Sequence, residues 1–578
     1  MKKTIRFTKR KIGAAIFATL ILAGGSACGN SESKTETTTA ATTTATKKED
    51  ETKGETKAPT SEASIAAPTG GAAEGVYPLA DSPELTYWFE LPTNNSTVVQ
   101  NFEETEFAKA LEEQTGIKVT YTHPPAAQAK ETFNVLVASN DLPDIIEYRW
   151  VTDFPGGVTA ALQNKVIISL NDQMADFAPS FTAYLESNPS IDRQIKTDDG
   201  IYSVFPFIRG DKYLQTTSGG MVRKDWLDEL NLDIPETMDD WEVMLTAFKD
   251  EKGATAPYTA VSNNNIDNLS NMFSSAYKFR FAASSAVYYM DGNTVKYAPL
   301  EPAYKDFLEK MNDWYNKGLI DKNFTLVDRK TLDANILNGT SGACYGPGGG
   351  GMGVWMEPGK EQTDTYDLVA VPSPVLNAGD EIEHFGSSYE FTQSSPGMAA
   401  ITNQCDNVEA AMRLLDYAFS EEGHILYNFG VEGESFEYVA GVPTYTELVM
   451  KNPNDLSVAQ AMAHYSRANS NGPFAQDPGY LLQYYEMPQQ KDALETWSIG
   501  DNRMQTIVPP TSFTQEESSK HAALIADIST YVTEMTVKFV MGAENFDNYD
   551  KFVEQLHSMK IDDAIALQQA AVDRYFDR

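Results

Sequence analysis

The sequence predicts an α/β fold in which helices cover a parallel β-sheet. Between residues 85 and 146, segments with the composition of strands alternate with segments of helical periodicity. In order they are a strand over 85–89, a helix over 102–114, a strand over 117–121, a helix over 133–139 and a strand over 142–146. This β-α-β-α-β order is typical of parallel strands joined by helices. The length of 578 residues predicts two or more lobes, at roughly 100–200 residues per domain.

The boundaries of these first elements follow from individual residues. Gly116 ends the helix over 102–114, since glycine adopts the left-handed conformation that closes many helices. Lys118 and Thr120 alternate with apolar residues and point outward from the second strand. The segment 142–146 is predicted to be a buried strand that follows a turn.

Three further helices are marked by apolar residues that recur every three or four positions. The first follows a capping box of Thr237 and Asp240, the second stops at Gly318, and the third has Asn407 as its N-cap. The apolar stripes are Trp241, Met244, Leu245 and Phe248; Tyr304, Phe307, Leu308, Met311, Trp314 and Tyr315; and Val408, Ala411, Met412, Leu415 and Phe419. We expect each stripe to pack in the core rather than to line a ligand site.

The first residues have the pattern of an export signal. Residues 1–12 carry six basic and no acidic side chains, and the apolar run Ile12–Gly24 follows. Cys28 comes directly after small residues, which is similar to a bacterial lipobox, although Gly25 stands where leucine is usual. We therefore expect residues 1–27 to be a lipoprotein signal peptide and Cys28 to be lipidated. The alternative is ordinary cleavage that releases the protein.

Residues 28–80 are predicted to be the lipidated cysteine and a disordered tether rich in Thr, Ala, Glu and Lys. From Gly29 to Gly75 there is no aromatic residue, and Ile65 is the single large apolar side chain. Such a segment cannot bury enough surface to offset its ordering entropy. The two cysteines that remain after Cys28, Cys344 and Cys405, do not make a disulfide framework, and the sequence leaves open whether they pair.

The charge excludes several classes of partner. The net charge is −37, from 82 acidic and 45 basic residues. Nucleic-acid phosphates and anionic lipid surfaces are repelled by such a body, so we expect no nucleic-acid partner. The acidity also argues against a strongly anionic ligand, unless Arg149, Arg209 or Arg223 concentrates positive potential in a cleft.

Motifs of common chemistries are missing. There is no zincin histidine pair, Cys-x-x-Cys, nucleophile elbow or EF-hand loop, so no cofactor or metal is expected. Gly346–Gly351 fits Gly-x-Gly-x-x-Gly, but no strong helix is predicted directly after it. We interpret this glycine run as a flexible or close-packed loop beside a ligand cleft. Paired carboxylates of a glycosidase stay open as an alternative, although no acid is singled out by its spacing.

Aromatic and polar residues meet where the predicted strands end. Ligands of open α/β sheets bind at these ends, and aromatic faces stack on sugar rings while carboxylates and arginines bind hydroxyls. The alternative for each residue alone is structural packing. The candidates are Trp88, Glu90, Tyr148, Trp150, Arg209 and Trp355.

From about Leu85 to the C-terminus, the order of several motifs resembles one known family. They are Ala138–Ile146, Asp199–Pro206, Val222–Leu227 followed by Pro235–Thr237, Trp314–Asp321, Leu415–Tyr417 with Ser420–Gly423, and Gly430–Gly433. The chain is similar to the family 1 extracellular solute-binding lipoproteins of bacterial carbohydrate ABC importers. The resemblance implies a two-lobed, periplasmic-binding-protein-like fold of type II, with lobes joined by hinge crossovers and ligand held between them. It also implies Arg223, Asp225 and Glu432 as further ligand-binding candidates.

The resemblance divides the folded body and assigns a role to it. We expect 81–208 plus 372–430 to form the N-terminal lobe, and 209–371 plus 431–578 the C-terminal lobe. The implied protein is a monomer without enzymatic activity, anchored by lipid at the extracellular face of the cell membrane. It captures a carbohydrate, most simply an oligosaccharide, and delivers it to ABC permease subunits. The alternatives are a secreted polysaccharide-active enzyme and a ligand-binding module that feeds a sensor kinase.

Overall fold

The computed structural model describes residues 76–262, 267–279, 288–383, 390–391, 395–500 and 503–578. The predicted signal peptide, Cys28 and all of the tether before residue 76 lie outside the described residues. The described residues all belong to one compact unit of the chain, Ser61–Arg578.

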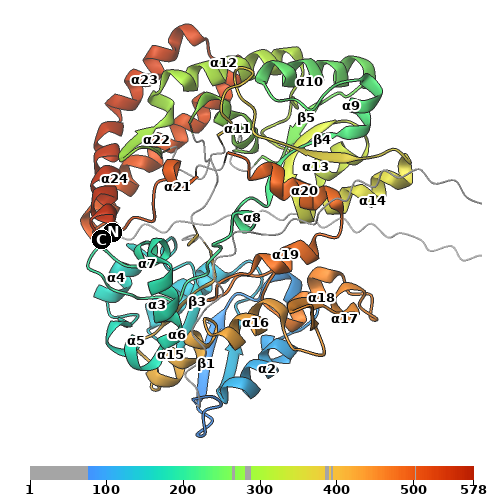
Figure 1. Cartoon of the computed structure of the whole chain (residues 1–578). Helices are drawn as coiled ribbons and strands as arrows, with labels where there is room; N and C mark the ends of the chain where they lie inside the picture. Colours follow the sequence, from blue (N-terminus) through green and yellow to red (C-terminus); the bar gives the residue numbers. More distant parts are fainter. Residues whose placement is uncertain (1–75, 263–266, 280–287, 384–389, 392–394, 501–502) are drawn as a thin grey trace, which may run out of the picture. The chain divides into compact units, whose positions relative to one another are not determined.

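The first lobe is built on a four-stranded sheet with the order β10-β3-β1-β2 (Figure 1). Its strands are β1 (Glu84–Phe89), β2 (Lys118–Thr122), β3 (Ile145–Tyr148) and β10 (Met398–Ile401). β1 pairs in parallel with both β2 and β3, whereas β10 runs antiparallel to β3. The predicted parallel β-α-β-α-β order is therefore confirmed, and β10 arrives from a distant part of the sequence.

Helices cover this sheet and bury its apolar side chains. The helix predicted over 102–114 begins later, because Phe102–Glu104 is a short 3₁₀ turn and Thr105 caps the helix that follows. The helices of the lobe are α1 (Thr93–Ser96), α2 (Glu106–Thr115), α3 (Ala129–Ser139), α4 (Gly157–Gln163), α5 (Asn171–Phe177), α6 (Pro179–Ser187), α7 (Pro189–Ile195), α15 (Val408–Tyr417) and α16 (Glu421–Phe429).

The second lobe contains a four-stranded sheet with the order β5-β8-β4-β9. Its strands are β4 (Ser218–Arg223), β5 (Tyr258–Ala260), β8 (Ala343–Pro347) and β9 (Leu368–Val371). β4 is antiparallel to β8 and β9, and β5 is parallel to β8. The lobe also has a hairpin of β6 (Tyr288–Asp291) and β7 (Thr294–Tyr297).

The helices of the second lobe include two that were predicted from apolar stripes, and their stripes are buried in one core. Thr237 and Asp240 form the expected capping box, and Gly318 ends the second helix in the left-handed conformation. The third predicted stripe lies on α15 of the first lobe, where Asn407 caps the helix. The helices of the second lobe are α9 (Lys224–Leu230), α10 (Met238–Lys252), α11 (Asp267–Phe273), α12 (Pro302–Lys317), α13 (Arg329–Leu337), α14 (Gly353–Gln362), α20 (Pro488–Trp497), α21 (Arg503–Thr506), α22 (Gln515–Met541), α23 (Tyr549–Ser558) and α24 (Ile561–Phe576).

Three segments pass side by side between the lobes. Ile208 bridges Phe391 in antiparallel fashion and Ala475 in parallel fashion. The Arg209 amide donates to the Glu390 carbonyl at 2.9 Å, and the Gln476 amide donates to the Ile208 carbonyl at 2.9 Å. The predicted two-lobed fold with hinge crossovers is confirmed. Short helices flank these crossovers: α8 (Lys212–Gln215) and α19 (Pro478–Tyr484).

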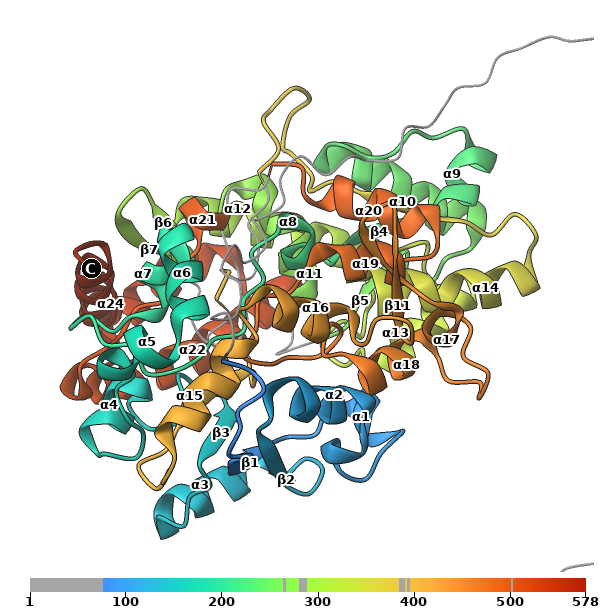
Figure 2. The ribbon, with the colours of Figure 1, turned by 60° about the horizontal axis from the view of Figure 1, so that its bottom comes forward.

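The lobe boundary predicted at residue 431 is wrong for the segment 431–476. This segment holds the hairpin β11 (Phe436–Val439) and β12 (Val442–Tyr445), followed by α17 (Glu447–Met450) and α18 (Val458–Tyr465). α18 packs against α1 and α2 of the first lobe, as Figure 2 shows. The chain enters the second lobe later, since α20 packs against β9 and β4. The sequence of α18 shows an apolar face, but it does not show which lobe this face packs against.

Candidate functional site

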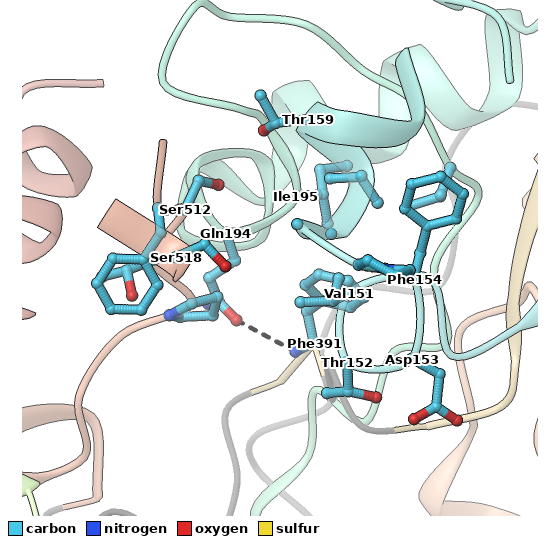
Figure 3. Close-up of a pocket in the computed structure, with 18 of the residues that line it drawn as sticks. Val151, Thr152, Asp153, Phe154, Thr159, Gln194, Ile195, Phe391, Ser512 and Ser518 are labelled. Carbon is cyan, nitrogen blue, oxygen red and sulfur yellow. Dashed lines mark hydrogen bonds between the residues drawn. The ribbon is translucent and has the colours of Figure 1, made fainter. Parts of the chain in front are cut away.

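A cavity of about 760 Å³ lies where the two lobes meet, and we call it the interlobe cavity (Figure 3). The first lobe contributes the loop 151–159 that follows β3, together with residues of α3 and α7. The second lobe contributes the segment 508–513 with Tyr288, Ser518 and Gln568. Because both lobes line it, a ligand here contacts both and favours the conformation that brings them together.

One wall of the interlobe cavity is tied to the hinge. The buried Gln194 of α7 accepts a hydrogen bond from the Phe391 amide at 3.1 Å, the contact drawn in Figure 3. Gln194 also donates to the Glu390 carboxylate. Phe391 in turn bridges Ile208 in the first crossover. A rotation at the crossovers therefore changes the lining of this cavity directly.

The charged side chains of the interlobe cavity are paired. Lys130 Nζ lies 3.0 Å from Asp153 Oδ1, and Lys196 Nζ lies 2.5 Å from Asp192 Oδ2. Burial, with a smaller contribution from Asp153, raises the pKa of Tyr148 to about 12. The remaining polar lining consists of hydroxyl and amide groups, which suit hydrogen bonds with a polar, uncharged ligand.

A second cavity of about 380 Å³ lies at the carboxyl ends of β1 and β3, and we call it the strand-end cavity. It is lined by Glu90, Leu91, Pro92, Thr93, Asn94, Glu147, Arg149, Pro396, Arg467, Asn469, Ser470 and Asn471. Parallel strands direct their carboxyl ends to one edge of a sheet, which is where open α/β sheets bind ligands.

The strand-end cavity is built on a buried ion pair. Arg467 Nη1 and Nη2 donate to the two carboxylate oxygens of Glu147 at 2.9 and 2.8 Å. The Tyr87 hydroxyl donates to the same carboxylate at 2.8 Å. Arg467 Cζ lies 5.2 Å from the centroid of the Phe89 ring, a cation–π contact. At the rim, Arg149 Nη1 lies 3.9 Å from Glu90 Oε2.

Of the predicted site residues, Glu90 lines the strand-end cavity, and the others line neither this cavity nor the interlobe cavity. Trp88 and Tyr148 are buried and pack edge to face, with ring centroids 5.6 Å apart. Trp150 is also buried, and its Nε1 donates to the Ile146 carbonyl at 3.0 Å. The expectation that these rings offer a face to a sugar is wrong for this structure, because side chains of the same lobe cover them. Trp355 is buried likewise, and its Nε1 donates to Asp333 Oδ1 at 2.8 Å.

The predicted charged residues have structural partners. Arg223 and Asp225 form a buried ion pair at 2.5 Å, with the guanidinium against the rings of Trp226 and Tyr366, so neither faces a cavity lined by both lobes. Arg209 lies at the crossovers, where its Nε donates to Gln476 Oε1 at 3.1 Å.

Glu432 is exposed in the loop before β11 and lines neither the interlobe nor the strand-end cavity. Its prediction came from the resemblance alone.

Sequence reasoning did not select Glu147 and Arg467. Glu147 carries a usable signal, because it is an acid inside the otherwise apolar strand Ile145–Tyr148 and a buried charge needs a partner. Nothing in the local sequence marks Arg467 as that partner, since 320 residues separate the two.

The glycine-rich run makes close contacts. Its residues end β8 and form one π-helical turn, Gly348–Met352, before α14 begins at Gly353. The expectation of no helix directly after the run is therefore wrong. A Cβ on Gly348 would lie 2.8 Å from the Tyr485 hydroxyl, and a Cβ on Gly351 would lie 3.1 Å from the Trp355 ring. The run is close-packed, as one form of the prediction had it, but it is a strand end and a helical turn rather than a loop.

Other chemistry is sparse in the described part of the chain. Cys344 and Cys405 are both free thiols. Among the residues that the structure describes, no group of three or more His, Cys, Asp or Glu side chains gathers as metal ligands do. Within the same residues, no helix combines the length and the apolar character needed to span a membrane.

Comparison with known proteins identifies the family that has this architecture. The family model of the bacterial extracellular solute-binding proteins matches residues 96–425, more than half of the chain. The fructooligosaccharide ABC transporter substrate-binding protein FusA of Streptococcus pneumoniae is 22% identical over 531 residues, covering 87% of this chain and 92% of FusA. Lipoprotein LipO of Bacillus subtilis is 23% identical over 371 residues, covering 62% of this chain and 69% of LipO.

A solved structure has the same fold. The crystal structure of alginate-binding protein AlgQ2 without calcium ion superimposes with a TM-score of 0.65 at 23% sequence identity, over 85% of this chain and 98% of AlgQ2. The two lobes, the hinge crossovers and the match to the family model lead to one conclusion: the chain belongs to the bacterial extracellular solute-binding proteins.

Proposed function

We propose that this protein is the substrate-binding subunit of an ABC importer and that it captures an oligosaccharide in the interlobe cavity. The observation that carries the proposal is that both lobes line this cavity and that its wall residue Gln194 is bonded to the hinge segment at Phe391. Ligand contacts from both lobes are what a hinge-closing binding protein requires. The relative FusA, named for fructooligosaccharide, supports the choice of ligand class.

The size and lining of the interlobe cavity suit a short oligosaccharide. Its volume of about 760 Å³ falls in the range of about 300–1,000 Å³ that is usual for ligand sites. Hydroxyl side chains from both lobes, such as Thr152 and Ser512, face it in Figure 3. The strand-end cavity, with Glu90 and Arg149 at its rim, is proposed as an extension of the site for further sugar units.

We also propose how the protein is attached to the cell. Lipidation at Cys28 would anchor it at the outer face of the cell membrane, and residues 29–80 would act as the tether. The supporting observations are the leader pattern of residues 1–27 and the lipoprotein relative LipO. Replacement of Cys28 by serine should release the protein from membranes into the medium, as measured by immunoblotting of cell fractions. Retention of the Cys28→Ser protein on membranes would overturn the anchor.

Binding is tested by calorimetric titration of the full chain with a panel of oligosaccharides, together with chromatography of the incubated sugars. We expect one ligand class to bind and every sugar to stay intact. Turnover of a bound sugar would favour the alternative of a polysaccharide-active enzyme. A panel without any binding sugar, when another class of solute binds, would overturn the proposal.

A pair of variants locates the binding site. Ser518 lines the interlobe cavity near the start of α22, whereas its neighbour Ser519 does not line it. Ser518→Tyr should occupy part of the cavity and weaken binding at least about tenfold, which corresponds to about 1.4 kcal/mol. Ser519→Tyr is the matched control and should bind as the unmodified chain does. Equal affinities of the two variants would place the ligand elsewhere.

A further inference from the structure

We propose that the ligand is an uncharged oligosaccharide and that paired charges in both cavities reject uronate chains. This inference rests on the proposed function and narrows its ligand class. Similar proteins are named for both kinds of ligand, neutral and anionic: FusA for fructooligosaccharide and AlgQ2 for alginate. Fructooligosaccharides are neutral, whereas every sugar of alginate carries a carboxylate.

The interlobe cavity has few charged side chains in its lining. Among the described residues that line it, the charged ones are Lys130, Lys196 and Asp153. Lys130 holds Asp153 at 3.0 Å, and Lys196 holds Asp192 at 2.5 Å. Asp192 also accepts from the Tyr202 hydroxyl at 2.5 Å, which fixes the acid in place. Each ammonium group already has its own carboxylate.

A ligand carboxylate that approaches either ammonium group would therefore be repelled by the acid already paired with it. Lys130 is well exposed, so a uronate has access to it, but Asp153 is only 14% exposed and stays beside the same ammonium. Like charges that share one cation disfavour each other. Solvent screens part of this repulsion at the exposed Lys130, and the low exposure of Asp153 preserves the rest. A sugar hydroxyl meets no such penalty, because it donates to Asp153 and accepts from Lys130.

The strand-end cavity repeats the arrangement. Its charged lining consists of two acids and two bases, Glu90, Glu147, Arg149 and Arg467. Arg467 is engaged by both oxygens of Glu147, and Arg149 lies 3.9 Å from Glu90. The other polar groups there are the uncharged side chains of Thr93, Asn94, Asn469, Ser470 and Asn471.

Two of the arginines predicted from the sequence as sources of positive potential lie elsewhere. Arg223 is buried against Asp225, and Arg209 is bonded to Gln476 at the crossovers and lines neither cavity. The net charge of −37 adds a repulsive field for any polyanion. The described lining of the interlobe cavity holds two lysines and one acid, and Asp192 beside it neutralises the second lysine. A uronate chain therefore gains no electrostatic advantage that offsets its desolvation.

The test is calorimetric titration of the full chain with two sets of matched length. One set holds neutral oligosaccharides, including kestose and nystose, and the other holds oligogalacturonates and oligoalginates. Each set is measured at about 0.05 and about 0.5 M NaCl, because ionic contacts weaken with salt. We expect a neutral sugar to bind with an affinity that changes less than about twofold with salt, and every uronate to bind at least about tenfold more weakly.

The outcomes separate the inference from the proposed function. A uronate that binds within tenfold of the best neutral sugar, or more tightly, would overturn the inference and leave the proposed function intact. Failure of both sets, with binding of another class of solute, would overturn the proposed function and the inference together.

A variant that removes one charge tests whether the paired charges cause the rejection of uronates. Asp153→Asn removes the acid beside Lys130 and should improve uronate binding at least about threefold, with a gain that declines at high salt. Asp172→Asn, an exposed residue of α5 that does not line the cavity, is the control with the same change in net charge. Equal effects of the two variants on uronate binding would show that net charge, rather than local pairing, excludes the anion and would overturn the inference.

Discussion

Glu147 at the end of β3 and Arg467 after α18 form a two-pronged, buried ion pair that joins segments 320 residues apart in the chain. The pair forms the floor of the strand-end cavity and ties the segment 431–476 to the first sheet. Gly472 allows this arrangement, since a Cβ there would lie 2.8 Å from the guanidinium carbon of Arg467.

Replacement of Arg467 by methionine should destabilise the first lobe by about 3–5 kcal/mol, because the Glu147 charge is left buried and unpaired. The measurement is the free energy of unfolding from urea denaturation. The double variant Glu147→Gln, Arg467→Met should recover part of this loss. If the double variant is as unstable as the sum of the two single variants, the two residues do not act as a pair.

Asp198 links the lobes at the far end of α24, where it accepts from Arg574 at 2.9 Å and from Arg578 at 2.7 Å. Asp198→Asn should raise amide hydrogen exchange in residues 511–513 and 574–578 by roughly tenfold, because hydrogen bonds to charged groups contribute about 1.5–3 kcal/mol. Asp199→Asn, at the exposed neighbouring position, is the control and should leave exchange unchanged. Unchanged exchange in Asp198→Asn would show that the ion pairs do not hold the lobes together.

Gly423 lies in the motif Ser420–Gly423, where α16 begins close to the end of α15. A Cβ at this glycine would lie 1.7 Å from the Tyr417 carbonyl oxygen. The backbone would have to move to remove this clash. Gly423→Ala should therefore lower the free energy of unfolding by about 2–4 kcal/mol. Gly350→Ala, whose Cβ meets nothing closer than 3.7 Å, should change it by less than about 1 kcal/mol. Equal losses would contradict the steric explanation.

Asp416 gives the first lobe a defined pH dependence. Burial raises the pKa of this carboxyl from 3.8 to about 6, although its Oδ1 accepts from the Phe181 amide at 2.7 Å. The folded state thus binds this proton more tightly than the unfolded state does. The stabilisation of the folded state by the protonated Asp416 is fully present below pH 3.8 and is lost as the pH rises through about 6.

Asp416→Asn should remove this dependence and keep an acceptor for Phe181. The difference in unfolding free energy between the variant and the unmodified chain should grow by up to about 3 kcal/mol between acid and neutral pH, in favour of the variant. Urea denaturation across the pH range measures it. A difference that is constant with pH, or that changes in the opposite direction, would contradict the raised pKa.

Local patterns were enough to predict the elements that hold this fold together. The alternation around β1 and β3, the capping box of α10 and the closing Gly318 of α12 are decided by neighbouring residues, so the sequence displays them. The direction of a side chain at a strand end is decided by distant packing. Trp88 and Trp150 therefore resembled ligand platforms although residues of their own lobe cover them.

Contacts between distant segments could not be predicted either, because they too depend on how the whole chain packs. Arg467 has no local feature that points to Glu147, and the segment 431–476 shows no pattern that assigns it to the first lobe. The loop 151–159 and the segment 508–513 line the interlobe cavity together only because the two lobes meet there. Individual residues predicted the strand-end edge through Glu90. A ligand site between the lobes followed from the family resemblance alone, which did not name the residues that line it.

The most direct measurement is a crystal structure of the full chain with the best-binding oligosaccharide. We expect one sugar chain in the interlobe cavity, with hydrogen bonds to Thr152 of the first lobe and Ser512 of the second, and without a carboxylate on the ligand. A ligand that contacts one lobe alone, or that lies outside the interlobe cavity, would contradict it.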